Sequence, residues 1–245
     1  MNDHNRQVDG SVQIIALSES AVAVHFGQKI DSELHQKVKA LTVYLEEHPF
    51  QGLLEVVPAF ANVTVFYDPM NVSNDNETPS TYVCTLLRQA ILGLKAMKAY
   101  TAREVVIPVC YGGEFGHDLE FVAAYHNLSV EEVIRIHSEG EYLVYMVGFA
   151  PGFPYLGGLS ERIATPRKEK PRLEVPPGAV GIGGAQTGIY SISTPGGWQL
   201  IGQTPLTLFL PNEDPPSLLQ SGDKVRFQPI SRKEYDAYKE GKAWH

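Results

Sequence analysis

Residues 181–188 read Gly-Ile-Gly-Gly-Ala-Gln-Thr-Gly, and they lie inside a segment unusually rich in glycine and proline. Between positions 148 and 216, 23 of 69 residues are glycine or proline, against 13 in the preceding 147 residues and 3 in the remainder. Both residue types disfavour helix interiors, so long helices are excluded from this segment. The uneven spread also excludes one uniform α/β repeat along the whole chain.

The glycine- and proline-rich segment predicts short strands. Its apolar runs cover residues 180–182, 189–193, 198–201 and 207–210, and a further run covers 225–229. Short strands separated by turn signals roughly every 8–12 residues are typical of a closed barrel or a sandwich.

The first hundred residues predict a separate α/β unit. Apolar alternation over residues 12–17, 21–26, 53–57 and 63–67 predicts strands, and apolar residues at helical spacing from 31 to 48 and from 79 to 97 predict two helices. The expected fold class is therefore α+β: an N-terminal α/β sandwich-like domain over residues 1–102, a closed barrel or sandwich over 103–230 and a helical tail over 231–245.

Two short helices are expected ahead of the glycine-rich segment. Asp118 follows Gly116 and is expected to cap the first, while Ser129 and Glu132 form a capping box for the second. Ser231 begins the same pattern at the C-terminal tail. Two histidines fall on the first pair of helices, where a surface or capping role is the expected one: His126 and His137.

Bulk composition narrows the setting. The net charge of −8 disfavours nucleic acid as a partner, because little would neutralise phosphates. The N-terminus lacks the apolar run of a signal peptide, and no 18-residue apolar stretch predicts a membrane span. Cys84 and Cys110 show no CxxC spacing and are expected to be reduced packing residues, with a disulfide as the alternative. A cytoplasmic protein without membrane attachment is expected.

The usual catalytic signatures are absent from the sequence. Residues 181–188 lack the lysine of a phosphate-binding P-loop, and Gln186 replaces the last glycine of a dinucleotide fingerprint. The eight histidines form no HExxH or Cys/His cluster, so no metal site is expected, and no GxSxG nucleophile motif occurs.

The remaining polar residues with useful chemistry gather around the glycines. Residues 167–172, Arg-Lys-Glu-Lys-Pro-Arg, place two arginines on a proline-stiffened loop suited to binding a carboxylate or phosphate. Pro195 and Gly196 are expected to form a type II turn that presents Trp198 at the start of a strand. In the structural alternative, the glycines are barrel corners, Trp198 is a core residue and the basic run is a solvated loop.

Several long blocks in this segment resemble one family. They are residues 147–158, Val-Gly-Phe-Ala-Pro-Gly-Phe-Pro-Tyr-Leu-Gly-Gly, residues 165–178, the 181–190 stretch, and residues 194–204, Thr-Pro-Gly-Gly-Trp-Gln-Leu-Ile-Gly-Gln-Thr. Together they closely resemble the B subunit of bacterial 5-oxoprolinase, the family that also contains the sporulation-kinase inhibitor KipI. The same module is related to the first subunit of allophanate-hydrolase-like and urea-carboxylase carboxyltransferase proteins. The resemblance implies that the domain over residues 103–230 is a cyclophilin-like β-barrel, preceded by an N-terminal α/β domain.

The family resemblance also implies a hydrolase that acts only within a complex. The B subunit works there with separate A and C subunits to convert 5-oxo-L-proline to L-glutamate, and the complex uses ATP. Opening an unstrained lactam is unfavourable, so coupling to phosphoryl transfer is chemically reasonable. The resemblance leaves the catalytic residues and the subunit that binds ATP unassigned.

Six positions matching the family blocks are candidates for substrate binding. Arg167 and Arg172 are expected to bind an anionic group of the substrate. Gln186 and Tyr190 are expected to orient the lactam, and Trp198 and Thr204 are expected to line a pocket. Two alternatives stay open: inhibition of a sporulation histidine kinase by blocking its autophosphorylation, and prolyl isomerisation by analogy to the barrel.

Overall fold

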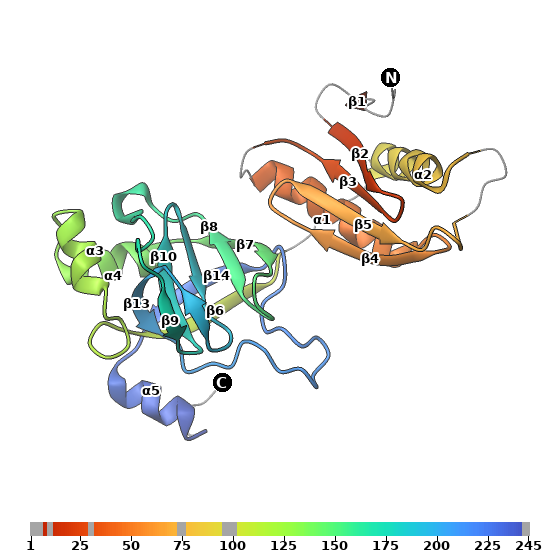
Figure 1. Cartoon of the computed structure of the whole chain (residues 1–245). Helices are drawn as coiled ribbons and strands as arrows, with labels where there is room; N and C mark the ends of the chain where they lie inside the picture. The colour runs from red at the N-terminus through yellow and green to blue at the C-terminus, as the bar shows by residue number, and fades with distance from the viewer. Residues whose placement is uncertain (1–6, 9–11, 29–31, 73–76, 95–101, 242–245) are drawn as a thin grey trace. The chain divides into compact units, whose positions relative to one another are not determined.

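The computed structural model describes residues 7–8, 12–28, 32–72, 77–94 and 102–241. The chain divides into two compact units, Met1–Thr101 and Ala102–His245. The first unit is a sheet with two helices, and the second contains a closed β-barrel (Figure 1). The predicted α+β class, with an α/β domain followed by a barrel domain, is confirmed.

The first unit contains a five-stranded sheet in the order β1-β2-β3-β5-β4, with every neighbouring pair antiparallel. Its elements are β1 (Gln7–Val8), β2 (Val12–Ser18), β3 (Ala21–His25), α1 (Ser32–Glu47), β4 (Leu53–Pro58), β5 (Asn62–Tyr67) and α2 (Pro79–Leu94). The four predicted strands and both predicted helices are present. Residue 31 and residues 95–97 of the predicted helices lie outside the described residues.

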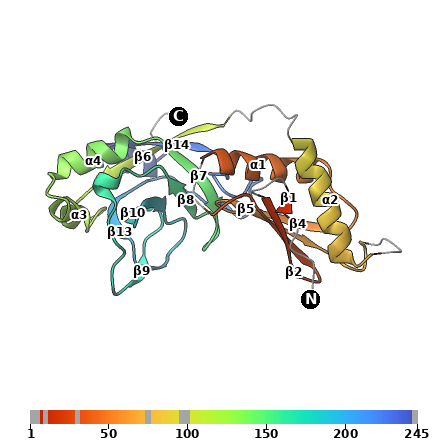
Figure 2. The same ribbon diagram turned by 90° about the horizontal axis from the view of Figure 1, so that it is seen from above.

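Both helices of the first unit cover the same face of its sheet (Figures 1 and 2). Alternate strand residues such as Val24 and Val65 are fully buried against apolar helix residues such as Leu41 and Leu87. This arrangement follows from the period-2 and period-3.6 apolar patterns, which place one apolar face on each element. Cys84 is a free, buried residue of this core.

The second unit is built around a seven-stranded closed barrel in the order β10-β11-β8-β7-β14-β6-β13, with β13 pairing back to β10. Its strands are β6 (Glu104–Tyr111), β7 (Tyr142–Val147), β8 (Pro154–Gly157), β10 (Ala179–Gly183), β11 (Gln186–Ile189), β13 (Gln199–Gln203) and β14 (Lys224–Pro229). The barrel interior is a single apolar core that includes Ile107, Val144, Ile182 and Val225. A separate two-stranded ribbon joins β9 (Arg172–Val175) and β12 (Thr194–Gly196).

Three α-helices and a short 3₁₀ helix accompany the barrel: α3 (Leu119–Tyr125), α4 (Val130–Glu139), α5 (Arg232–Lys239) and η1 (Glu161–Ile163). Figure 2 shows α3 and α4 beside one another at the barrel, where they contact β13 and β14 respectively. The predicted capping boxes are present, Ser129 with Glu132 on α4 and Ser231 with Glu234 on α5. Asp118 is at the N-cap position of α3 as predicted, but its carboxylate makes no capping hydrogen bond and binds other elements instead.

The strands in the glycine-rich segment differ in detail from the prediction. The strand predicted over 189–193 runs instead over Gln186–Ile189, since Gly184, with a φ of +69°, allows a tight turn directly after Gly183. The run at 207–210 contains no strand, only an isolated bridge from Phe209 to Ser217. In the described part of the chain, no helix is long and apolar enough to cross a bilayer.

Candidate functional site

A small aromatic cluster lies on the outer face of the β10–β11 hairpin. Ile182 points into the barrel core, so the alternating side-chain positions at Gly181 and Gly183 face outward. The residues packed on this outer face form a cluster separate from the barrel core: Phe153, Val175, Ala179, Tyr190, Trp198 and Leu200. Phe153 meets the rings of both Tyr190 and Trp198 edge to face, at centroid distances of 5.2 and 5.6 Å.

The glycine-rich motif forms the seat for the Trp198 indole. A Cβ atom on Gly183 would lie 2.5 Å from Cε2 of Trp198, and one on Gly188 would lie 3.0 Å from its Cζ3. A Cβ on Gly188 would also lie 2.8 Å from the Pro154 carbonyl oxygen, so at both positions a side chain would force a neighbouring group to move. Residues 181–188 therefore form a hairpin that packs an aromatic ring, and no helix follows them to meet a phosphate.

Gly196 has a similar packing role. Pro195 and Gly196 do not form the predicted type II turn: they belong to β12, and Gly196 lacks the positive φ that such a turn requires. A Cβ atom at this position would overlap the phenol hydroxyl of Tyr190. The glycine is therefore needed for the close approach of the Tyr190 ring, which is itself 2% exposed.

Arg167 lies over the indole of Trp198. The guanidinium carbon is 5.5 Å from the ring centroid, within the range of a cation–π interaction, and the Arg167 side chain is exposed. Its backbone is held on both sides. The Lys168 N–H donates to the Gly197 carbonyl at 2.7 Å, and Nε2 of Gln199 donates to the Pro166 carbonyl at 2.9 Å.

Arg172 and Lys168 bind the same carboxylate, that of Asp118. Nη2 of Arg172 is 2.7 Å from both Asp118 oxygens, and Nζ of Lys168 is 3.1 Å from Oδ1. The Leu200 N–H also donates to Oδ2 at 2.7 Å. Burial alone would raise the pKa of Asp118, but hydrogen bonds from Arg172, Leu200 and Lys168 outweigh it, and the net pKa is lowered.

Of the two remaining predicted site residues, Gln186 lies on the β10–β11 hairpin and Thr204 lies away from it. Gln186 is opposite Gly183 on the hairpin, and within the described residues its buried Nε2 has no hydrogen-bond acceptor. Thr204 is fully buried beyond the far end of β13, where its N–H donates to the Gly178 carbonyl. The structure thus gathers five of the predicted site residues around the hairpin and its ribbon, and it places Thr204 apart from them.

His137 is fully buried in the barrel, so the prediction of a surface or capping role for it is wrong. Its Nε2 lies 3.0 Å from Oγ1 of Thr187, which donates to the Gly181 carbonyl, so the histidine is the donor in this pair. Its Nδ1 then accepts from the Tyr111 hydroxyl at 2.7 Å. Burial lowers the pKa of His137 to about 3, which keeps the ring neutral.

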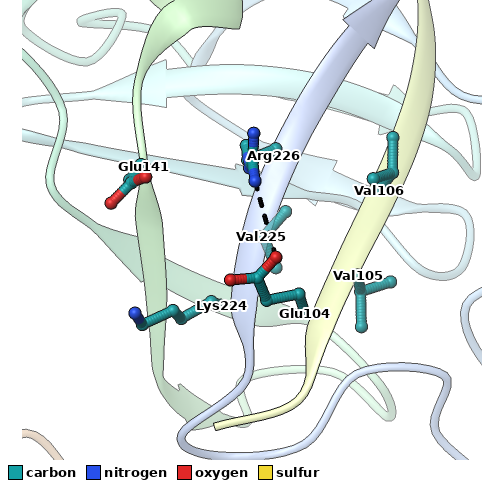
Figure 3. Close-up of a pocket in the computed structure, with 7 residues that line it drawn as sticks. All are labelled: Glu104, Val105, Val106, Glu141, Lys224, Val225 and Arg226. Atoms are coloured by element: carbon teal, nitrogen blue, oxygen red, sulfur yellow. Dashed lines mark hydrogen bonds and ion pairs between the residues drawn. The ribbon is translucent and has the colours of Figure 1, made fainter.

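A shallow pocket lies elsewhere on the barrel. Figure 3 shows its lining from β6, β14 and the residue before β7: Glu104, Val105, Val106, Glu141, Lys224, Val225 and Arg226. The Arg226 and Glu104 side chains form an exposed ion pair across it at 3.4 Å. In the strand order, β14 and β6 are not neighbours of the β10–β11 hairpin, and none of the predicted site residues lines this pocket.

Comparison with known proteins identifies the family of this chain. Residues 12–219 match the family described as the carboxyltransferase domain, subdomain C and D. The chain belongs to this family. It is 52% identical over 236 residues to the B subunit of the 5-oxoprolinase of Bacillus subtilis, covering 93% of this chain and 97% of the relative. The B subunit of the Haemophilus influenzae 5-oxoprolinase is 44% identical over 216 residues, covering 88% and 97%.

A solved structure supports the same fold for this carboxyltransferase-domain chain. The urea carboxylase of Kluyveromyces lactis matches with a TM-score of 0.76 over 98% of this chain. The match covers 24% of the yeast enzyme at 18% identity, so it bears on the fold alone.

Sequence reasoning missed two residues of the site in this carboxyltransferase-domain chain. Asp118 is expected from its position to be a helix cap, yet its carboxylate is the shared partner of Arg172 and Lys168. Phe153 is not among the predicted site residues, although it is the centre of the aromatic cluster. The four cations of residues 167–172 indicated that an anionic partner was needed, because an arginine removed from water requires one. Nothing in the sequence indicated that residue 118 lies beside them.

Proposed function

We propose that this chain is the B subunit of a 5-oxoprolinase, which acts with separate A and C subunits to hydrolyse 5-oxo-L-proline to L-glutamate at the expense of ATP. The observation that carries the proposal is the end-to-end match to the B subunit of the Bacillus subtilis 5-oxoprolinase, at 52% identity over 97% of that protein. The match also covers 93% of this chain.

The chemistry of the outer-barrel cluster is compatible with this substrate. 5-Oxo-L-proline carries a carboxylate and a cyclic amide. Arg167 offers an exposed guanidinium to the carboxylate, whereas the buried Gln186 Nε2, which has no acceptor among the described residues, must first become accessible to donate to the amide. Arg167 is exposed at the edge of a cluster whose Trp198 and Tyr190 side chains are buried, so another subunit that completes the site would meet it through Arg167.

We assign no ATP site to this chain. The one glycine-rich motif that resembles a phosphate loop is occupied by the Trp198 indole and is not followed by a helix. Among the described residues, no group of three or more histidine, cysteine or acidic side chains is arranged to hold a metal ion. ATP is therefore proposed to be used by the complex and bound outside this hairpin.

Reconstitution tests the proposal. This chain is co-expressed with candidate A and C subunits, and 5-oxoproline-dependent ATP hydrolysis and glutamate release are measured together. Both products are expected with all three chains, and neither when this chain is omitted. A folded ternary mixture that releases neither product would refute the proposal. If the same preparation inhibited autophosphorylation of a sporulation histidine kinase, the regulatory function would replace it.

A further inference from the structure

The cations around the aromatic cluster are unequally paired. Arg172 and Lys168 both bind Asp118, a residue only 5% exposed. Within the described part of the chain, the exposed Arg167 contacts the Trp198 ring but has no carboxylate partner. The segment 167–172 carries four cations and one glutamate, so even after pairing with Asp118 it keeps a net positive charge. An anion from outside the chain would neutralise part of this remaining positive charge.

Asp118 connects this segment to the barrel. Its carboxylate accepts the Leu200 N–H of β13, and its backbone N–H donates to the Leu200 carbonyl at 2.8 Å. The other contacts of the carboxylate are the two cations at residues 168 and 172, which follow Arg167 in the chain. Asp118 thereby fixes the loop immediately after Arg167, while the Pro166 carbonyl is fixed immediately before it by Gln199.

We propose that Arg167 binds the carboxylate of the substrate on the Trp198 platform, and that Asp118 is a positioning residue that holds Arg167 there through Lys168 and Arg172. This inference rests on the proposed function, since it names the part of 5-oxo-L-proline that the site recognises. It also separates the two arginines: Arg167 meets the substrate, and Arg172 is already bound within the chain.

The chemical class of ligand follows from how Arg167 is held. The Arg167 guanidinium carbon lies 5.5 Å from the centroid of the Trp198 ring, and in the described part of the chain no carboxylate pairs with its N–H groups. Two parallel N–H donors match the two oxygens of a carboxylate, and such bidentate pairs are among the stronger hydrogen bonds in proteins. A lysine at this position would supply charge without that geometry.

The test uses the reconstituted three-subunit complex and two ligands that differ only in charge. KM and kcat are measured for 5-oxo-L-proline, and an inhibition constant is measured for its neutral analogue 5-oxo-L-prolinamide. For Arg167→Ala we expect KM to rise about tenfold to a hundredfold, as for loss of a charge-assisted hydrogen bond. For Asp118→Asn we expect a rise of about fivefold to tenfold, with kcat and the inhibition constant of the amide within about twofold.

Asp223→Asn is the matched control. Asp223 is likewise buried in the second unit and bound by both Nε and Nη2 of an arginine, Arg103, but it touches none of the residues around Trp198. The Asp223→Asn variant should lower the free energy of unfolding, as Asp118→Asn does, and should leave the KM for 5-oxo-L-proline unchanged. If Asp118→Asn does not fold, Lys168→Met removes one partner of Asp118 and keeps the aliphatic stem of the lysine.

A double-mutant cycle distinguishes positioning from general structural damage. In the Arg167→Ala background, Asp118→Asn should raise KM no further, because the group that it positions is gone. An additive effect, or equal weakening of the acid and the amide, would overturn the inference and leave the proposed function standing. An inactive wild-type complex would instead refute the proposed function itself, and this inference would be withdrawn with it.

Discussion

The Trp198 indole lies directly over Gly183, at a position where any side-chain carbon on residue 183 would be 2.5 Å from the ring. The relationship explains a motif that resembles a phosphate loop in sequence. The glycines at 181, 183 and 188 leave room for an aromatic ring on the outer barrel wall, and the ring in turn supports Arg167. The spacing of these glycines therefore serves packing.

Gly183→Ala should displace the indole and destabilise the barrel. Overpacking of this kind lowers the free energy of unfolding by about 1–3 kcal/mol. Urea unfolding followed by Trp198 fluorescence in a Trp244→Phe background would measure both effects. Gly197→Ala is the control, because a Cβ there meets its nearest neighbours at an ordinary 3.6 Å. Equal stability of the two variants would contradict this account of the motif.

Removal of Arg172 should destabilise the second unit, because it leaves the buried Asp118 carboxylate with Lys168 as its remaining cation. Breaking such a pair lowers stability by about 3 kcal/mol. The comparison is Arg226→Met, which removes an ion pair with Glu104 whose side chains are 58% and 62% exposed. Arg226→Met should lower the free energy of unfolding by less than about 1 kcal/mol. Denaturant unfolding of Arg172→Met and Arg226→Met tests the difference, and similar losses would show that the Asp118 pair is no stronger than a surface pair.

Acid should weaken the same ion pair. The folded-state pKa of Asp118 is lowered, so its contribution to stability is complete above the ordinary aspartate pKa of about 4. It is lost as the pH falls through the lowered value, because the unfolded chain then binds a proton that the folded chain resists. The difference in unfolding free energy between wild type and Asp118→Asn should therefore shrink below about pH 4. A difference that is constant from pH 6 down to the acid limit of folding would contradict the pairing.

His137 should weaken the second unit as the pH falls below 6.5, as the buried His35, whose pKa is lowered to about 4, should weaken the first unit. The folded pKa of His137, about 3, lies below the unfolded value of 6.5, so its contribution is complete above pH 6.5 and declines as the pH falls toward 3. Between its folded and unfolded pKa values, one such histidine changes the free energy of unfolding by about 1.4 kcal/mol per pH unit. His137→Gln should reduce the slope of unfolding free energy between pH 6 and 4. The exposed His48→Gln variant should retain it, and an unchanged slope in His137→Gln would place the proton uptake elsewhere.

Local patterns predicted the first unit well because most of its elements bury one face, although residues 21–24 of β3 are buried on both faces. The apolar alternation of β2, β3 and β5 and the helical spacing of α1 and α2 are satisfied by neighbours within about a hundred residues. The barrel was harder to predict. Its strand boundaries depend on where a hairpin turns at Gly184, and β8 and the ribbon strand β9 are only four residues long.

The site could be predicted in part. Arg167 and Trp198 were identified because residue types of unusual chemistry stand in a proline- and glycine-rich context, and the structure brings them into contact. The roles of Asp118 and His137 depend on burial by strands remote in sequence: Asp118 is 82 residues from its partner Leu200, and His137 is 50 from Thr187. A local helical pattern cannot indicate which of its polar residues will be enclosed by distant strands.

The parallel pairing of β6 with β14 has a consequence for how the protein is made. Val105 pairs with Val225 and Ile107 with Phe227, so the strand that opens the barrel is joined to the strand that completes it. The ribosome must synthesise the chain through residue 229 before this ladder can form, whereas the sheet of the first unit is complete by residue 67. Domains generally fold as units in the order of their synthesis. The N-terminal unit can therefore fold early during translation, while the barrel that supports Trp198 closes only after residues 224–229 have been made.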